Sequence, residues 1–119
     1  MPRMAAPAFQ VVGHAGSNAG VHILRVTGAI THSTAPAFQG AVAAAGPSTD
    51  LIIDMSEVPS VDSMAIGALV RAYAFCNKAG RKFTLVGLNH RVANVLQLTG
   101  VDSLFDTYAS IPEAESALT

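Results

Sequence analysis

The sequence predicts one α/β domain built on a mixed sheet of four to five strands with about four helices. Short apolar segments at residues 51–54 and 83–86 alternate with longer segments whose apolar residues recur at helical spacing. An opening pair of β-branched segments, residues 9–13 and 21–27, flanks a loop rich in turn formers and predicts a hairpin. With 119 residues, 50% of them hydrophobic, the chain is large enough to bury one core.

The first helix is expected directly after the hairpin. Gly28 should end the second strand, and Ser33 or Thr34 should cap a helix that accepts Pro36 in its first turn. A glycine–proline pair at residues 46–47 should stop this helix. Its core-facing residues are predicted to be Phe38, Ala41, Val42 and Ala45.

Residues 51–54 are the best candidate for the centre of the sheet, because this segment is too short for a helix and apolar on both alternating faces. After it, Asp62 and Ser63 are both good N-cap residues, so Ser63 should lie in the first turn of a second helix. The stripe predicted to pack against the sheet is Ile66, Leu69, Val70 and Tyr73. The opposite, accessible side should carry Met64, Gly67 and Arg71.

A third helix is expected after the next strand. Gly80 should end the second helix, and residues 83–86 should form the strand that follows it. Asn89 or His90 should cap the third helix, which Gly100 should end. The residues predicted to share one face of this helix are Val92, Val95, Leu96 and Thr99.

The two ends of the chain are less regular. Residues 1–8 contain two prolines and little periodicity, so we expect a loose lead-in before a domain that spans residues 9–118. Near the other end, residues 104–108 should form a short edge strand. Ser110 followed by Glu113 fits a capping box that opens a last helix.

Composition and charge argue against several classes of function. The net charge is -1 and the seven basic residues are scattered, so we expect no direct binding of nucleic acid. No apolar run approaches the roughly 18 residues that span a bilayer, and the start of the chain lacks a secretory core, so we expect neither a membrane span nor export. A single cysteine, Cys76, cannot form an internal disulfide and is typical of a small buried or half-buried side chain in a reduced, cytoplasmic protein.

Metal, cofactor and catalytic sites are not expected. The four histidines, which are His14, His22, His32 and His90, show no ligand spacing with Cys76 or with paired carboxylates. Ser63 lacks the Gly-x-Ser-x-Gly elbow of serine hydrolases, and no histidine is placed to act as its base. Neither a Gly-x-Gly-x-x-Gly nor a Gly-x4-Gly-Lys turn occurs, so no nucleotide cofactor is predicted. We therefore expect a protein that is not an enzyme.

Ser63 is the strongest candidate for a functional residue. In the first turn of a helix its hydroxyl would point outward beside unpaired backbone amides, and that end of a helix tolerates a phosphate. Two interpretations are open: Asp62 and Ser63 only satisfy helix amides, or Ser63 is the phosphorylation site of a switch. Asp54 and Glu57, which precede it, are either ordinary loop acids or part of a partner-binding face.

Several motifs in one order together resemble a known family. Leu51-Ile52-Ile53-Asp54, Val61-Asp62-Ser63 and Ile66-Gly67-Ala68-Leu69 are similar to that family's central strand, its aspartate-serine site and the helix that follows. Residues 26–35 are similar to its strand that ends in glycine and turns into the first helix, and residues 80–101 to its next strand and helix. The family is the STAS domain, found in bacterial anti-sigma factor antagonists and at the ends of anion transporters. The resemblance runs from about residue 9 to residue 118.

The resemblance implies a phosphorylation switch at Ser63. In the antagonist branch, the unphosphorylated domain binds an anti-sigma factor that is a serine kinase, and the sigma factor is freed for transcription. The kinase then phosphorylates the serine, the pair separates, and a serine phosphatase restores the cycle. The partner-binding residues expected here are Asp62, Ser63, Met64, Gly67 and Thr31.

Two positions differ from the usual pattern of the family. Met64 and Ala65 stand where a serine or threonine and then a glycine usually follow the aspartate-serine pair, so Ser63 is the only hydroxyl in the motif. Thr31 stands where the antagonist branch usually carries an acidic residue. The alternative function is a STAS subunit of a transport complex, or a module that binds a small ligand, in which Ser63 is only a cap.

Overall fold

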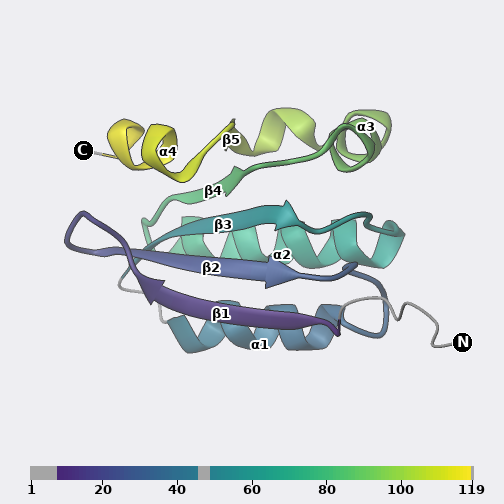
Figure 1. The fold of residues 1–119 in the computed structure, drawn as a ribbon, viewed down its shortest axis with the longest axis horizontal. Helices are drawn as coiled ribbons and strands as arrows, with labels where there is room; N and C mark the ends of the chain where they lie inside the picture. The colour runs from purple at the N-terminus through teal and green to yellow at the C-terminus, as the bar shows by residue number, and fades with distance from the viewer. Residues whose placement is uncertain (1–7, 46–48, 119) are drawn as a thin grey trace, which may run out of the picture.

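The computed structural model, which describes residues 8–45 and 49–118, contains a five-stranded sheet flanked by helices (Figure 1). The strands lie in the order β1-β2-β3-β4-β5, which is also their order in the sequence. This arrangement confirms the predicted α/β fold with a mixed sheet. The elements are β1 (Gln10–Ala15), β2 (Val21–Thr27), α1 (Ala35–Ala45), β3 (Asp50–Glu57), α2 (Ser63–Lys78), β4 (Phe83–Val86), α3 (His90–Leu98), the 3₁₀ turn η1 (Asp102–Leu104), β5 (Asp106–Tyr108) and α4 (Ile111–Ala117).

Strand direction determines which loops meet. β1 and β2 form the predicted antiparallel hairpin, whereas β2, β3, β4 and β5 are parallel to one another. Parallel neighbours need crossover connections, which α1, α2 and α3 provide. The carboxyl ends of β2 and β3 therefore lie at the same end of the sheet, where the loop after β2 and the start of α2 come together (Figure 1).

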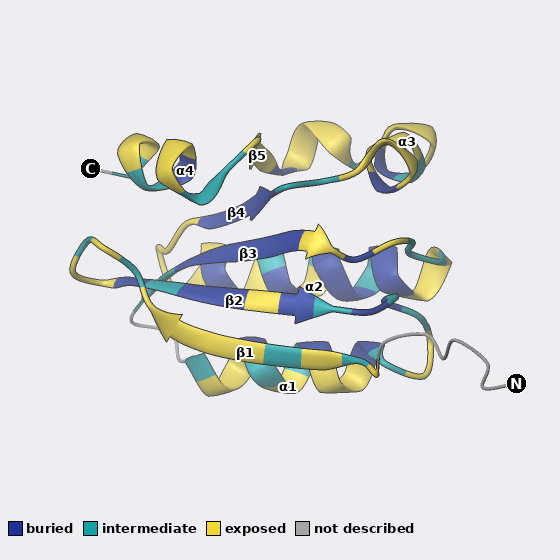
Figure 2. Ribbon diagram, viewed as in Figure 1, coloured by how far each residue is buried: buried dark blue, intermediate teal, exposed yellow. Residues whose placement is uncertain are grey.

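The core lies on both faces of the central strands. Helices α1, α2 and α3 pack against one face, and α4 packs against the other (Figure 1). Figure 2 shows β3 and β4 largely buried and the edge strand β1 largely exposed. Leu51, Ile52 and Ile53 are completely buried, which confirms this segment as the centre of the sheet.

The buried face of α2 differs in part from the predicted stripe. Leu69 is completely buried and Ile66 nearly so, as predicted, but Val70 and Tyr73 lie at the margin of the core and are only partly buried. The rest of the buried face consists of small residues, namely Ala65, Ala68, Ala72 and Cys76. Their small side chains allow α2 to approach the sheet closely, and the predicted burial of Cys76 is confirmed.

Three element boundaries differ from the prediction. β3 continues to Glu57 rather than ending at Asp54, because the chain pairs again with β2 at Thr27 after a shift of register. β5 begins only at Asp106, because η1 precedes it. Thr99 was predicted to share the apolar face of α3, but it is the exposed C-cap, and its hydroxyl donates to the Val95 carbonyl at 2.8 Å.

The helix ends otherwise follow the sequence signals. Asn89 rather than His90 caps α3, Ser110 caps α4, and Gly80 adopts the positive φ of 75° expected just after α2. The expected lead-in up to residue 7 and the expected stop at residues 46–47 lie outside the described residues. No helix within the described ranges is long and apolar enough to cross a membrane.

Candidate functional site at the start of α2

The start of α2 is fixed by Asp62. This residue has an extended backbone, and its carboxylate oxygen Oδ1 accepts a hydrogen bond from the Ala65 N–H at 2.9 Å. Its carbonyl accepts from the Ile66 N–H at 3.2 Å. Asp62 is therefore the N-cap, and Ser63 is the first residue of the helix.

The loop that follows β2 is held against this helix start. Ile30 and Val61 form an isolated parallel bridge, in which Ile30 N–H donates to the Ser60 carbonyl and Asp62 N–H donates to the Ile30 carbonyl, both at 3.2 Å. The second carboxylate oxygen of Asp62 accepts from the His32 N–H at 3.1 Å. The His32 ring nitrogen Nδ1 lies 4.0 Å from the same oxygen. One aspartate thus ties the two loops together.

Thr31 is part of the framework of this loop. Its hydroxyl accepts from the Ser33 N–H at 3.2 Å, and its carbonyl accepts from the Ala35 N–H at 2.7 Å. Its own N–H donates to the Thr34 hydroxyl, which in turn donates to the Ala29 carbonyl. The predicted cap residue Thr34 directly precedes α1, but its hydroxyl is hydrogen-bonded to backbone groups of the loop rather than to a helix amide. Thr31 therefore shapes the loop beside Asp62.

Asn89 holds the segment that leads into α2. Its side-chain amide donates to the carbonyls of Val58 and Pro59, both at 3.1 Å. Its amide oxygen accepts from the Val92 N–H at 2.8 Å and so caps α3. A single side chain therefore fixes both the start of α3 and the loop between β3 and α2.

The residues around Ser63 offer an accessible surface. Ser63 is exposed, and Met64 is 54% exposed. Gly67 lies one turn further along and is partly exposed, and a Cβ built there would meet only the guanidinium of Arg71, at 3.2 Å or more. The candidate residues Asp62, Ser63, Met64 and Gly67 thus lie along one end of α2, with the loop of Thr31 next to them.

The charge next to Ser63 is negative. The Ala65 N–H holds the pKa of Asp62 below its ordinary value, opposed by partial burial and supported by the backbone N–H groups of His32 and Met64. Asp62 is therefore ionised at neutral pH. A phosphate on Ser63 would meet the positive end of the helix dipole on one side and this carboxylate on the other.

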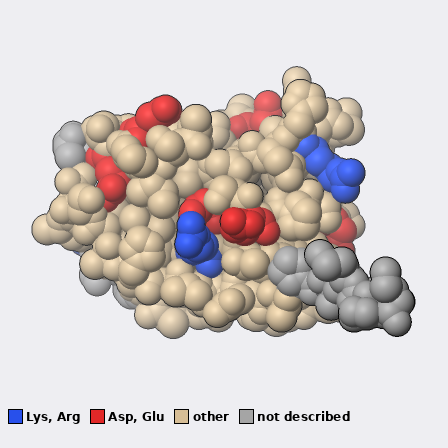
Figure 3. All heavy atoms as spheres, viewed as in Figure 1, with Lys and Arg blue, Asp and Glu red and all other residues tan. Residues whose placement is uncertain are grey.

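Asp54 belongs to the sheet rather than to this site. Its carboxylate accepts from the Ser56 N–H at 3.0 Å and from the Ser56 hydroxyl at 2.7 Å, and it lies 3.6 Å from Arg25 Nε. Figure 3 shows basic and acidic groups side by side near the middle of the face of the molecule that is turned toward the viewer. Asp54 is buried, whereas Glu57 is exposed at the end of β3.

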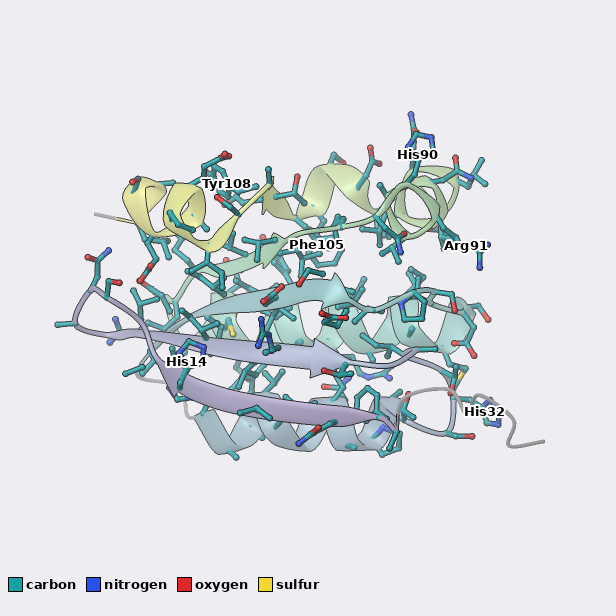
Figure 4. All side chains as sticks on the ribbon, in the orientation of Figure 1. His14, His32, His90, Arg91, Phe105 and Tyr108 are labelled. Atoms are coloured by element: carbon teal, nitrogen blue, oxygen red, sulfur yellow. The ribbon has the colours of Figure 1, made fainter. Side chains whose placement is uncertain are left out.

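Sequence reasoning missed His32 and the clamp that Asn89 forms. His32 is 30 residues from Asp62, and no local motif links them. The available signal was the parallel pairing of β2 and β3, which brings the two following loops together. Figure 4 shows His32 at this end of the sheet and His14 at the opposite end. Among the described residues, no three His, Cys, Asp or Glu side chains come together in a group that could hold a metal ion.

The sequence as a whole has known relatives. Residues 15–114 match the family described as the STAS domain. A Thermotoga maritima protein, provisionally named an anti-sigma factor antagonist, is 34% identical over 64 residues, which are 54% of this chain and 57% of that protein. The match thus spans little more than half the length of the curated relatives.

Solved structures share the fold over most of the chain. The crystal structure of an anti-sigma factor antagonist from Mycobacterium paratuberculosis matches with a TM-score of 0.81 and 28% identity, over 96% of this chain and 97% of that one. The murine anion transporter Slc26a9 matches with a TM-score of 0.74 and 29% identity, over 84% of this chain but only 18% of the transporter. The fold is therefore shared by an antagonist and by one part of a transporter.

Proposed function

We propose that this chain, which belongs to the STAS domain family, is an anti-sigma factor antagonist controlled by phosphorylation of Ser63. In this proposal the unphosphorylated domain binds an anti-sigma factor that is also a serine kinase, so that a sigma factor is released. The kinase phosphorylates Ser63, the complex dissociates, and a serine phosphatase restores binding. The cycle takes place in the cytoplasm, and the chain itself catalyses no reaction.

The observation that carries the proposal is an exposed serine hydroxyl that the helix does not need. Asp62, not Ser63, accepts the N–H of Ala65 and so caps α2. Ser63 is exposed beside Met64 and can be reached by a kinase. A serine with no capping role at an accessible helix start, beside a loop held by His32 and Asp62, supports a modification site rather than a structural one.

The expected effect of phosphorylation differs between the fold and the interface. A phosphoserine adds about -1.5 to -2 charges, and at an exposed helix start the dipole offsets this by about 0.3–1 kcal/mol, so the domain should stay folded. In a complex the phosphate must lose water beside the Asp62 carboxylate, and like charges brought together in an interface cost several kcal/mol. A loss of about 3–4 kcal/mol weakens binding several-hundred-fold.

The direct test uses the anti-sigma kinases that the source genome encodes, each purified and mixed with this protein and ATP. We expect one of them to bind the protein and to transfer phosphate to Ser63, as mass spectrometry would show. Ser63→Ala should bind this kinase but accept no phosphate at that position. Phosphate transfer to another residue, with Ser63 unmodified, would contradict the proposal.

A second test concerns the surface rather than the serine. Gly67→Arg should weaken kinase binding and leave the fold intact, because the nearest atoms to a Cβ there belong to the guanidinium at the flexible end of Arg71. The matched control is Ala74→Arg, on an exposed position of the same helix three turns from its start. Equal affinity of the two variants in calorimetry would place the interface elsewhere.

The alternative is a STAS subunit of a transport complex or a module that binds a small ligand. The match to part of an anion transporter at 29% identity favours keeping it as the second candidate. In that case no kinase would modify Ser63, and Ser63→Glu would leave assembly with the partner unchanged. Phosphate transfer therefore separates the two functions.

A further inference from the structure

The outer edge of β1 carries backbone groups that pair with no other described strand. Within residues 8–45 and 49–118, β1 is the first strand of the sheet and pairs with β2 alone, in an uninterrupted register from Gln10 to Ala15. Directly beyond it, the Gly16 N–H donates to the Val21 carbonyl of β2 at 2.8 Å. Backbone groups of successive residues in a strand point to opposite sides. The N–H and carbonyl groups of Val11, Gly13 and Ala15 therefore point away from β2, and the Ala15 carbonyl lies 3.2 Å from the ring nitrogen Nδ1 of His14, within hydrogen-bond distance.

A cavity lies beside this edge, under helix α1. It has a volume of about 280 Å³ and is lined by β1, β2 and the last turns of α1, through Val11, Gly13, His22, Leu24, Ala41, Ala44 and Ala45. Gly13 is necessary for its shape, because a Cβ there would come within 2.7 Å of the His22 ring. Small residues on the strand and on the helix thus leave an open space between the two elements.

The described residues that line the cavity include no Asp, Glu, Lys or Arg. None of these residue types occurs in β1 or α1, and Arg25 of β2 is not among the lining residues. Natural edge strands are usually protected by lysine, proline or a bulge. β1 has none of these, and Val12 on its opposite face is 48% exposed. A basic side chain entering the cavity would lose water without finding a carboxylate among the lining residues.

We propose that β1 and α1 form a groove that binds an extended, uncharged peptide segment of a partner protein as a sixth strand. The segment pairs with the outward backbone groups of Val11 and Gly13 and with the Ala15 N–H, and it places one aliphatic side chain in the cavity. In an antiparallel pair, directly opposed residues project to the same face. The peptide residue opposite Gly13 therefore projects to the α1 side, toward the cavity that Gly13 and His22 line.

The size of the cavity favours a side chain over a free small molecule. Sites for drug-sized ligands occupy roughly 300–1,000 Å³ and enclose most of the ligand, whereas this cavity lies just below that range and opens beside a strand edge. Addition of a strand gives affinity through the main chain and specificity through pockets for alternate side chains. The groove offers both a strand edge and a side-chain pocket. It lies at the end of α1 that is far from the start of α2 (Figure 1).

The test uses a defined probe, a capped heptapeptide with serine at both ends and valine and threonine alternating between them, so that three valines share one face. Titration of the isotope-labelled protein should shift the amide signals of Val11, Gly13 and Ala15 and those of residues 41–45. Replacing the central valine of the peptide by lysine should abolish these shifts. Ser63→Glu should leave the binding unchanged, because the groove acts independently of the switch.

Two variants of the protein separate the cavity from the strand edge. Ala44→Leu fills the cavity from an exposed position and should weaken binding roughly tenfold or more, whereas Ala43→Leu, exposed on the same helix outside the cavity, should not. Val11→Pro removes one outward N–H without removing a bond to β2, and it should also abolish binding.

Three results would overturn the proposal. Ala44→Leu and Val11→Pro could bind the peptide as well as the unchanged protein, or the peptide could shift signals only on α2 or on the open face of the sheet. Sedimentation could also show dimers whose formation shifts the β1 signals without peptide. In that case the groove is an interface between two copies of this chain.

Discussion

Two surfaces of this domain differ in how they are built and in what they can recognise. At the carboxyl ends of the strands, the loop after β2, the loop before α2 and Asn89 form a corner held by side-chain to backbone hydrogen bonds, with Asp62 ionised beside Ser63. We call this the switch corner. At the other end of α1, the groove between β1 and α1 contains no charged side chain.

The difference shows which surface can be controlled by charge. In the switch corner a new phosphate would lie beside a fixed carboxylate, so we expect the proposed modification to alter binding strongly while the fold tolerates it. The groove has no charge with which a phosphate could interact, and its recognition would depend on main-chain pairing and on the fit of one side chain. Kinase binding should therefore be sensitive to salt and to the state of Ser63, and peptide binding in the groove should be sensitive to neither.

The largest loss of stability is expected from a substitution in the core on which both surfaces depend. Leu69 is completely buried in the cluster that joins α1, α2 and the sheet. Leu69→Ala should therefore destabilise the domain by about 2–5 kcal/mol. Denaturant unfolding measures this change, and the exposed control Met64→Ala should change stability by less than about 0.5 kcal/mol. If Leu69→Ala lowered the free energy of unfolding by less than about 1 kcal/mol, the two surfaces would not depend on this part of the core.

A smaller effect should be confined to the switch corner. Asn89→Ala removes the cap of α3 and the two bonds to the carbonyls of Val58 and Pro59, so we expect a loss of about 1–3 kcal/mol. The exposed Asn94 of the same helix provides the control Asn94→Ala. Hydrogen exchange should speed up at residues 58–64 and stay unchanged in β1. Faster exchange in both places would contradict the independence of the two surfaces.

The smallest effect concerns the dependence of stability on pH. The folded-state pKa of Asp62 is lowered, chiefly by the Ala65 N–H, relative to an unfolded value of about 3.9. Its contribution to stability is therefore present above that value and is lost as the pH falls through the folded-state pKa. Asp62→Asn should flatten the stability profile between about pH 5 and pH 2, while Asp106→Asn, on the exposed edge strand, should not. If the free energy of unfolding changed with pH in the same way for the unchanged protein and for Asp62→Asn, the charge of Asp62 would not contribute to stability.

Local signals in the sequence predicted most of the fold. Strand runs, caps and glycine stops placed β4, α2 and α3, because each depends on neighbours within a few residues. Val70 and Tyr73 were assigned to the core by periodicity alone, which cannot show that Ala65 and Ala68 fill much of the buried face of α2 and leave larger neighbours at its margin. Thr99 was assigned to the core in the same way, although it is the exposed C-cap of α3.

Contacts between distant segments were not predictable in the same way. The hydrogen bond from His32 to Asp62 and the amide clamp of Asn89 depend on the order and direction of β2, β3 and β4. The cavity beside Gly13 depends on the path of α1 along β1. No local pattern carries that information.

The central claim is that phosphate on Ser63 ends partner binding without unfolding the domain. The most direct measurement is calorimetric titration of the identified kinase with the unmodified protein and with protein phosphorylated at Ser63, next to thermal unfolding of both forms. We predict affinity lower by several hundred-fold for the phosphorylated form, an unfolding midpoint within a few degrees of the unmodified one, and no change for Ser103→Glu, which adds a charge at the distant turn η1. Equal affinity of the two forms for the kinase would contradict the account.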